Sequence, residues 1–349
     1  MPSDTHDDIR NLLVQATADL PAIAPAPDRT VRRARWRVVR TVSLLGLSAG
    51  LVLGAVVHAV DPFNRSLPAK TPDVASGAWI VDIDTGAATH MVGLPQQAFW
   101  FSASRDGTAL AVAGDTHGRS QIFLLDPNGS SPHQVTHDRY GASEPALSQD
   151  GTMLAYQGFG RSTTRNVFVM DLTTGVSRQV THERKDVSEL EWSPDGTRIL
   201  YSVTIKAVGK GPTLSRPPSN LLKVVDIRTR HVETIAGDRR SPADFGTWSP
   251  DGQIAYMTNG RFPNGVYAFQ HAEIWVADAD GGNRRLLLSL GGAGFSLEWS
   301  PTGSDVAFSA PDGDALSTYV ADVETHQVRR VAPGYVTTWI DDHTMIVHI

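Results

Sequence analysis

The chain contains no cysteine among its 349 residues, and its 31 Lys and Arg are outnumbered by 37 Asp and Glu. The lack of cysteine excludes disulfides, thiolate metal sites, a cysteine nucleophile and a lipid-modified N-terminal cysteine. The formal net charge of −6 speaks against a nucleic acid partner, which would require a basic surface. The 31 Gly and 21 Pro, by contrast, suit a turn-rich β fold.

Motifs that carry catalysis are also missing. The twelve histidines are scattered, and the close pair His133 and His137 falls in a strand and loop region, not on a zinc-binding helix. The segment Gly46-Leu47-Ser48-Ala49-Gly50 matches a nucleophile elbow, but it lies inside a long apolar run, where that motif cannot work. We therefore predict no catalytic residues, no resident metal or cofactor and no enzymatic activity.

One five-residue segment, in its fullest form Trp-Ser-Pro-Asp-Gly, recurs along the chain in whole or in part. The copies are Ala103–Gly107, Leu147–Gly151, Trp192–Gly196, Trp248–Gly252 and Trp299–Gly303. Their glycines are 44, 45, 56 and 51 residues apart, and a period of this size indicates a repeat architecture.

Each copy separates two apolar segments, as in Ile199, Tyr201 and Val203 after the third, and the pattern predicts strand, tight turn, strand. A second pair of strands follows in each repeat, and four strands per repeat indicate a β-propeller blade. Segments 78–86 and 338–347 supply a further blade shared by the two ends. The sequence predicts an all-β fold, a six-bladed propeller closed by pairing N- and C-terminal strands.

These Ser-Pro-Asp-Gly blades resemble the WD-like repeats of TolB-type propellers, over residues 78–349. The resemblance implies the fold. It says less about function, because such repeats are similar to those of periplasmic scaffolds and of the propeller domains of serine peptidases.

The N-terminal region predicts a membrane anchor. Five arginines between residues 32 and 40 precede an uncharged stretch, 41–60, of bilayer-spanning length. We expect residues 1–40 to form a cytoplasmic head with a short helix, 41–60 a transmembrane helix, 61–77 a Pro-rich tether and 78–349 the propeller. The arginines place the N-terminus in the cytoplasm and the propeller outside the cell membrane. A cleaved signal peptide is the alternative, and it too would export the propeller.

Two features of this region suggest partners. Residues 1–30 carry apolar residues at helical spacing, which is typical of a cytoplasmic partner helix or of a short solvated one. Gly46, Gly50 and Gly54 lie at four-residue steps, as in a homodimer seam, although glycine is common in membrane spans. The head, basic run and span resemble those of actinobacterial anti-sigma-like membrane regulators.

Acidic residues cluster on the strands expected to line the central channel of the propeller. Carboxylates converging on an axis could hold Ca²⁺, or they could be solvated or packed against arginines of a neighbouring blade. These residues are Glu144, Glu189, Glu191, Asp244 and Glu298.

Two long connections, 206–220 and 259–271, are predicted to be loops that open on the face away from the repeated turn. These two connections, and the segment that follows the last strand of the first full blade, carry basic and aromatic side chains. This composition is typical of protein interfaces. The predicted binding residues are Arg139, Tyr140, Lys206, Lys210, Arg216, Arg261, Phe262, Tyr267 and Phe269.

The sequence thus predicts an extracytoplasmic, membrane-anchored propeller that binds a protein or other ligand as a scaffold. Two alternatives stay open. One is a transmembrane regulator of the anti-sigma type with the propeller as its sensor. The other is a propeller lactonase or lyase that uses the channel carboxylates and a metal.

Overall fold

The computed structural model describes residues 77–160, 164–205, 219–238, 241–261 and 267–349. The predicted head, membrane span and nearly all of the predicted tether lie outside these ranges. The part of the chain that is described contains no helix long and apolar enough to cross a membrane.

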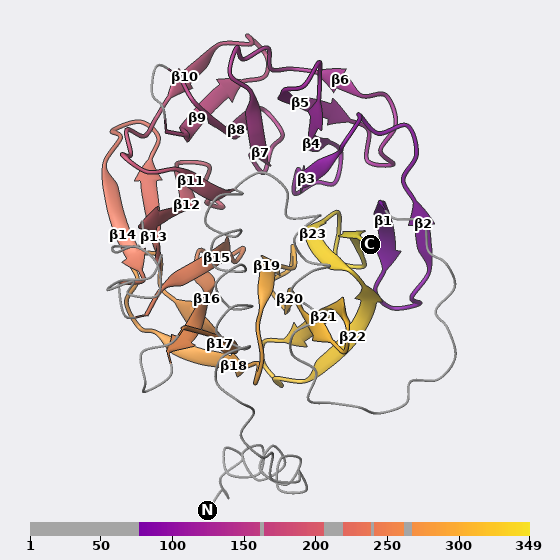
Figure 1. The fold of residues 1–349 in the computed structure, drawn as a ribbon, viewed down its shortest axis with the longest axis vertical. Helices are drawn as coiled ribbons and strands as arrows, with labels where there is room; N and C mark the ends of the chain where they lie inside the picture. Colours follow the sequence, from indigo (N-terminus) through magenta and orange to yellow (C-terminus); the bar gives the residue numbers. More distant parts are fainter. Residues whose placement is uncertain (1–76, 161–163, 206–218, 239–240, 262–266) are drawn as a thin grey trace, which may run out of the picture. The chain divides into compact units, whose positions relative to one another are not determined.

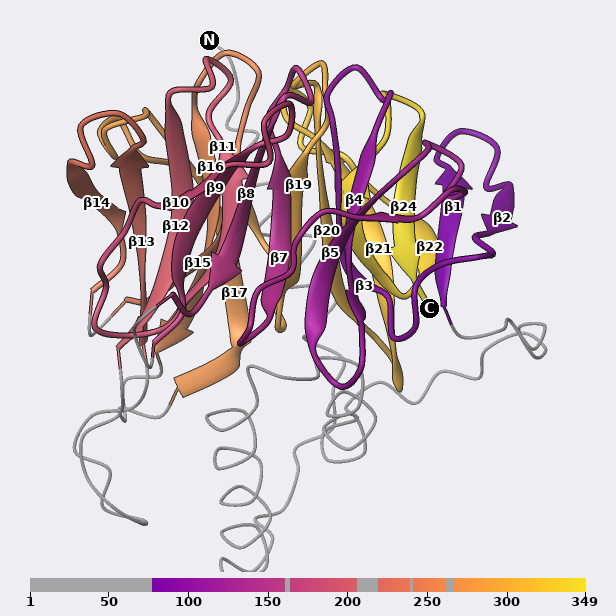
Figure 2. The same ribbon diagram turned by 90° about the horizontal axis from the view of Figure 1, so that it is seen from above.

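The described residues form six four-stranded antiparallel sheets, which are arranged as blades around a common axis (Figures 1 and 2). This confirms the predicted six-bladed propeller. Blade 1 comprises β3 (Phe99–Ala103), β4 (Leu110–Asp115), β5 (Ser120–Leu125) and β6 (His133–Gln134). Blade 2 comprises β7 (Ala142–Leu147), β8 (Met153–Gly158), β9 (Asn166–Asp171) and β10 (Ser177–Gln179).

The next three blades have longer strands. Blade 3 comprises β11 (Val187–Trp192), β12 (Arg198–Ile205), β13 (Ser219–Asp226) and β14 (Val232–Ala236). Blade 4 comprises β15 (Ala243–Trp248), β16 (Ile254–Arg261), β17 (Tyr267–Ala277) and β18 (Arg285–Ser289). Blade 5 comprises β19 (Phe295–Trp299), β20 (Asp305–Asp312), β21 (Ala315–Asp322) and β22 (Val328–Pro333).

Blade 6 joins the two ends of the described chain. Its inner strands are β23 (Tyr335–Trp339) and β24 (Thr344–His348), and its outer strands are β1 (Ala78–Asp82) and β2 (Ala88–His90). Strand β1 pairs with β24 in continuous register, and Gly77 and Ile349 exchange two backbone hydrogen bonds of 2.9 Å. The predicted closure by terminal strands is therefore confirmed, and it pairs both edges that an open ring of blades would expose.

The repeated segment is the turn between the first two strands of a blade. In blade 3 the Ser193 hydroxyl donates to the Asp195 carboxylate and accepts the Arg198 N–H, and Gly196 adopts a φ of 66°. The Asp195 carboxylate also accepts the Thr197 N–H at 3.0 Å. The serine hydroxyl therefore stabilises the turn through its two hydrogen bonds, while glycine supplies the left-handed backbone conformation that other residues rarely adopt.

The hydrophobic core is divided among the seams between blades, where six clusters of buried side chains each draw on two adjacent blades. Trp192 is one example. It is only 4% exposed, packs with Ala146 and Val169 of blade 2, and donates its indole N–H to the Ala146 carbonyl at 2.9 Å. Trp192 thus links blade 3 to blade 2, whereas the buried indole N–H groups of Trp248 and Trp299 have no hydrogen-bond partner among the described residues.

Each innermost strand contains a register shift typical of a β-bulge. At the bulges of blades 1 to 5 one residue has a φ between 44° and 57°, and these residues are Trp100, Glu144, Glu189, Phe245 and Ser296. The bulge matters for the candidate sites because it turns a backbone N–H out of its own blade.

The predicted loop 259–271 is shorter than expected. Strand β16 continues to Arg261 and β17 begins at Tyr267, so that Arg261 pairs directly with Tyr267. Strand β13 likewise already includes Ser219 and Asn220. The antiparallel pairing of β16 with β17 continues as far as Arg261 and Tyr267, because the residues of both strands can extend the ladder of backbone hydrogen bonds. Arg261, Tyr267 and Phe269 therefore belong to strands and not to a loop.

Candidate functional site

The five predicted channel carboxylates all lie on innermost strands, which surround the axis in Figure 1. Strand β7 carries Glu144, β11 carries Glu189 and Glu191, β15 carries Asp244, and β19 carries Glu298. All five residues are half-buried. The structure brings them into two groups, since Asp244 lies near Glu144 and Glu189, whereas Glu298 lies near Glu191.

Three of these carboxylates bind backbone N–H groups of the next blade. Glu144 accepts the N–H of Glu189 at 2.6 Å, and Glu189 in turn accepts the N–H of Phe245 at 2.9 Å. Glu191 accepts the N–H of Trp248 at 3.0 Å and the hydroxyl of Thr247 at 3.2 Å. The partners expected from the sequence were solvent, a cation or neighbouring arginines. The bulges at Glu189 and Phe245 instead present two backbone donors and Trp248 presents the third, and the carboxylates accept all three across the blade seams.

The remaining carboxylates have other surroundings. Asp244 accepts a hydrogen bond from the Asn220 side chain through Oδ2, while its buried Oδ1 has no partner among the described residues. A proton on the adjacent Glu189 would give that oxygen a donor. The Glu298 carboxylate makes no hydrogen bond to any described residue, and only its backbone carbonyl is engaged, by the Trp339 indole at 3.3 Å.

Burial raises the pKa of four of these carboxyl groups. The pKa of Glu144 rises to about 7 and that of Glu298 to about 8. For Glu189 and Glu191 burial moves the pKa well above the usual value, and the negative charges of Asp244 and Glu298, respectively, move it further in the same direction. Acids of this kind stay protonated to a higher pH than exposed ones. Among the described residues, moreover, no group of three or more His, Asp or Glu is placed to hold a metal ion.

Of the predicted binding residues, Arg139 and Tyr140 are described in full. They precede β7, at the end opposite to its repeated turn, and the Arg139 guanidinium lies 5.6 Å from the centre of the Tyr140 ring. Tyr140 is 61% exposed, which makes it an accessible aromatic side chain beside a cation. Lys206, Lys210, Arg216 and Phe262 lie outside the described residues.

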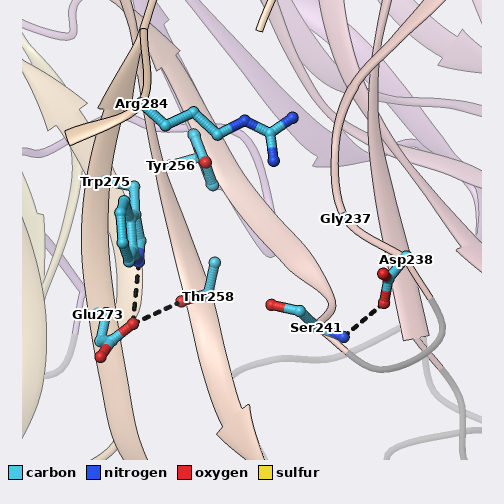
Figure 3. Close-up of a pocket in the computed structure, with 8 residues that line it drawn as sticks. All are labelled: Gly237, Asp238, Ser241, Tyr256, Thr258, Glu273, Trp275 and Arg284. Atoms are coloured by element: carbon cyan, nitrogen blue, oxygen red, sulfur yellow. Dashed lines mark hydrogen bonds between the residues drawn. The ribbon is translucent and has the colours of Figure 1, made fainter. Parts of the chain in front are cut away.

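A pocket of about 210 Å³ lies where the segment after β14 meets the outer part of blade 4 (Figure 3). Glu273 accepts the indole N–H of Trp275 at 3.0 Å, and Thr258 donates to the same carboxylate oxygen at 3.5 Å. The Asp238 carboxylate accepts the Ser241 N–H at 2.7 Å. The lining residues are Gly237, Asp238, Ser241, Tyr256, Thr258, Glu273, Trp275 and Arg284.

This pocket was not anticipated from the sequence, although its signal is present. Tyr156, Tyr201 and Tyr256 follow the aspartate of the repeated turn by 6, 6 and 5 residues, so that each falls on the second strand of its blade. When the blades are aligned on these three tyrosines, the residues around each tyrosine differ from blade to blade, and this difference is the signal. The polar composition of the pocket suits a small polar or charged ligand group.

Comparison with known proteins supports the fold. Residues 71–210 match the family model of the TolB beta propeller domain, which confirms the resemblance to TolB-type propellers. None of the curated proteins matches the sequence.

Several solved structures are similar to this chain. A putative TolB from Agrobacterium tumefaciens aligns with a TM-score of 0.62 at 18% identity, covering 78% of this chain and 98% of that one. TolB from Acinetobacter baumannii aligns with a TM-score of 0.56 at 16% identity, covering 90% and 72%. A chain of a nidogen/laminin complex aligns with a TM-score of 0.54 at 10% identity, covering 74% and 94%. Identities this low show a shared fold.

Proposed function

We propose that the chain is a scaffold of the cell envelope, whose propeller binds a protein partner outside the membrane and whose residues 41–60 anchor it. The match of residues 71–210 to the TolB beta propeller domain supports an envelope role by analogy. The basic run and the following apolar stretch support the anchor and its orientation.

The observation that carries the binding role is the exposed pair of Arg139 and Tyr140. An aromatic ring that is 61% exposed and lies under a guanidinium leaves a large apolar surface to be buried by a partner. Tyrosine and arginine are the side chains most enriched at the centres of protein interfaces. Strand β12 of blade 3 also ends on this face, at Ile205.

The inner carboxylates support a scaffold more than an enzyme. Glu144 and Glu189 each use Oε2, and Glu191 uses both oxygens, in hydrogen bonds to the next blade that hold the propeller together. A lactonase or lyase would need such carboxylates to be available to substrate or metal.

Photocrosslinking of the full-length protein in its own membranes tests the binding role. A photoreactive residue is placed at Tyr140 by the substitution Tyr140→p-benzoylphenylalanine, and the matched control carries it at Thr152. Thr152 is exposed in the turn after β7 and therefore marks the other end of the same strand. We expect a discrete crosslinked partner from position 140 and none from position 152. Equal products from both positions, or none from 140, would refute the proposed face.

The anchor is tested separately, with the cysteine-free sequence as background. Thr5→Cys and Thr152→Cys are labelled in intact cells with a membrane-impermeant maleimide. The topology predicts labelling at position 152 and protection at position 5 until the membrane is permeabilised. A mature protein that lacks position 5 would show that the apolar stretch is a cleaved signal and not an anchor.

A further inference from the structure

One short segment occurs twice at the end of the propeller opposite to the repeated turn, which is called the loop end below. Residues 134–140 lead from blade 1 into β7, and residues 179–185 lead from blade 2 into β11. Both read Gln-Val-Thr-His-acid-Arg, followed by Tyr140 in the first and Lys185 in the second. A partial third copy, Asp238-Arg239, runs out of the described residues and is not part of the site. The repeat places Arg139 and Arg184 at equivalent positions of adjacent blades.

The same hydrogen bonds hold both segments in place. The Thr136 hydroxyl donates to the Gln121 side-chain oxygen at 2.8 Å, and that oxygen also accepts the N–H of the acidic residue two positions further on at 3.1 Å. The Thr181 hydroxyl donates to the Asn166 side-chain oxygen at 2.9 Å, and that oxygen accepts the equivalent N–H at 2.6 Å. The threonine of the repeat therefore has a role inside each blade.

The acidic side chains of the two segments contact groups of the following blade. Glu183 accepts the Tyr201 hydroxyl at 3.0 Å and lies 2.7 Å from the Lys223 ammonium. Asp138 is half-buried beside the Tyr156 hydroxyl. Neither carboxylate forms an ion pair with the arginine that follows it in the chain. The charge of both guanidiniums is therefore available to groups from outside.

The arginines themselves lie on the surface. Arg139 and Arg184 are exposed, and neither forms an ion pair or hydrogen bond with any described residue. The Arg139 guanidinium lies 5.6 Å from the centre of the Tyr140 ring, which is 61% exposed. The neighbouring acid Asp186 already accepts a backbone N–H at 2.7 Å. Together with Lys185, the arginines form a basic surface around an accessible aromatic ring.

The two arginines lie at the same level of neighbouring blades. Each comes three residues before the innermost strand of its blade, which is β7 for Arg139 and β11 for Arg184. These strands are neighbours at the axis (Figure 1), and the Glu144 carboxylate of β7 accepts the N–H of Glu189 on β11 at 2.6 Å. One side chain thus bridges the two strands. An extended segment of a few residues is therefore long enough to reach both guanidiniums.

We propose that the surface formed by Arg139, Tyr140, Arg184 and Lys185 binds an acidic segment of the protein partner. This inference deepens the proposed scaffold function and rests on it. A guanidinium binds a carboxylate through two parallel N–H donors, which fixes both the position and the orientation of the acid. The exposed face of the Tyr140 ring offers an apolar contact to a side chain next to those acids.

A protein segment fits this surface better than a flat anionic membrane does. At the loop end of blade 5, the connection from β20 to β21 carries Asp312 and Asp314. Asp312 pairs with Arg330 at 2.8 Å, whereas Asp314 is exposed. A plane of lipid phosphates in contact with the whole loop end would meet this negative charge as well. A short segment is confined to the basic surface and avoids the repulsion.

The probe that tests the surface is the end-blocked peptide Glu-Glu-Leu-Glu-Glu, labelled with an uncharged dye. Its counterpart has glutamine in place of every glutamate. Binding to the full-length protein in a neutral detergent is followed by fluorescence anisotropy at low ionic strength. We expect the acidic peptide to bind saturably and to be released by added salt, since salt screens ion pairs at a surface. Equal binding of both peptides, or no binding of the acidic one, would overturn the proposal.

Three variants locate the binding surface. Arg184→Glu reverses one charge and should weaken binding of the acidic peptide about tenfold. Arg184→Lys keeps the charge but loses the paired donors, and should weaken binding about threefold. Arg285→Glu makes the same change in net charge at an exposed position of β18, at the opposite end of the propeller, and should stay within about twofold of the original. Equal losses in Arg184→Glu and Arg285→Glu would refute a local site.

Competition separates this inference from the scaffold function itself. The unlabelled acidic peptide should suppress the crosslink formed from position 140. A crosslink that the peptide leaves unchanged would preserve the scaffold and refute an acidic partner. A peptide that binds where position 140 yields no crosslink would refute the scaffold, and the acidic partner with it. Vesicles of phosphatidylglycerol that displace the labelled peptide at a lower charge concentration than the unlabelled peptide would assign the surface to a membrane and overturn the proposal.

Discussion

The seams between blades are closed by two different chemistries. Toward blades 3 and 4, the innermost strands are joined by carboxylates, with Glu144, Glu189 and Glu191 accepting backbone N–H groups. In other blades the residue at the position of Glu191 is a serine or threonine, and its hydroxyl accepts the hydrogen bond that Glu191 accepts. Ser102 binds the N–H of Leu147 at 3.0 Å, Thr247 binds that of Trp299 at 3.2 Å, and Thr338 binds that of Ala103 at 3.3 Å.

The difference shows that a backbone N–H in the same position can be hydrogen-bonded by acceptors with different responses to pH. A hydroxyl has the same charge over the whole physiological range, whereas a buried carboxyl group with a raised pKa changes its charge within it. The carboxylate seams should therefore lose stability as the pH rises, and the hydroxyl seams should not. This contrast leads to three predictions.

The largest effect is expected at Glu191. Glu191→Ala removes the acceptor of both the Trp248 N–H and the Thr247 hydroxyl and leaves a buried backbone donor unpaired. The free energy of unfolding should fall by about 3 kcal/mol, measured by urea denaturation at about pH 5. Glu191→Gln retains an acceptor oxygen and should lose far less. Equal losses for the two variants would mean that packing, not the hydrogen bonds, holds this seam.

The next effect is that of pH itself. Because burial raises the pKa of Glu144 from 4.5 to about 7, the folded protein binds this proton more tightly than the unfolded chain. The resulting stabilisation is fully present below pH 4.5 and is lost as the pH rises through about 7. Glu144→Gln removes the ionisation and should raise the free energy of unfolding at about pH 8 by about 1–2 kcal/mol, within the limit of about 3 kcal/mol set by the size of the shift.

The change in stability between about pH 5 and about pH 8 should accordingly be smaller in Glu144→Gln than in the unchanged protein. The comparison must be made between variants, because His348 acts in the opposite direction, its pKa being lowered by burial. Glu324→Gln, at an exposed position between β21 and β22, serves as the control and should leave the pH profile unaltered. An unchanged profile in Glu144→Gln would contradict the assignment.

The smallest effect belongs to a hydroxyl seam. Ser102→Ala removes the acceptor of the Leu147 N–H and should lower the free energy of unfolding by about 1 kcal/mol, equally at about pH 5 and about pH 8. Thermal unfolding at the two pH values checks this. A loss that depends on pH would show that the two kinds of seam are not independent.

The fold could be predicted from the sequence because a turn such as Trp192–Gly196 is a local signal that recurs with the blade. The placement of the carboxylates on innermost strands followed from the same period. Their partners did not, because the bulges at Glu144 and Glu189 arise from backbone conformation and from the neighbouring blade, which no short segment encodes. In blade 4 the alternation of Tyr267 and Phe269 was available as a strand signal but was outweighed by the surrounding polar and turn-forming residues.

The closure in blade 6 also orders events during synthesis. Strand β1 leaves the ribosome first, but its partner β24 comes from the last residues of the chain. Until those residues emerge, β1 has no inner neighbour, and the seam clusters on both sides of blade 6 lack the side chains of β23 and β24. The ring can therefore close only after β24 has emerged from the ribosome, and a chain that lacks β24 leaves an exposed strand edge that is prone to aggregation.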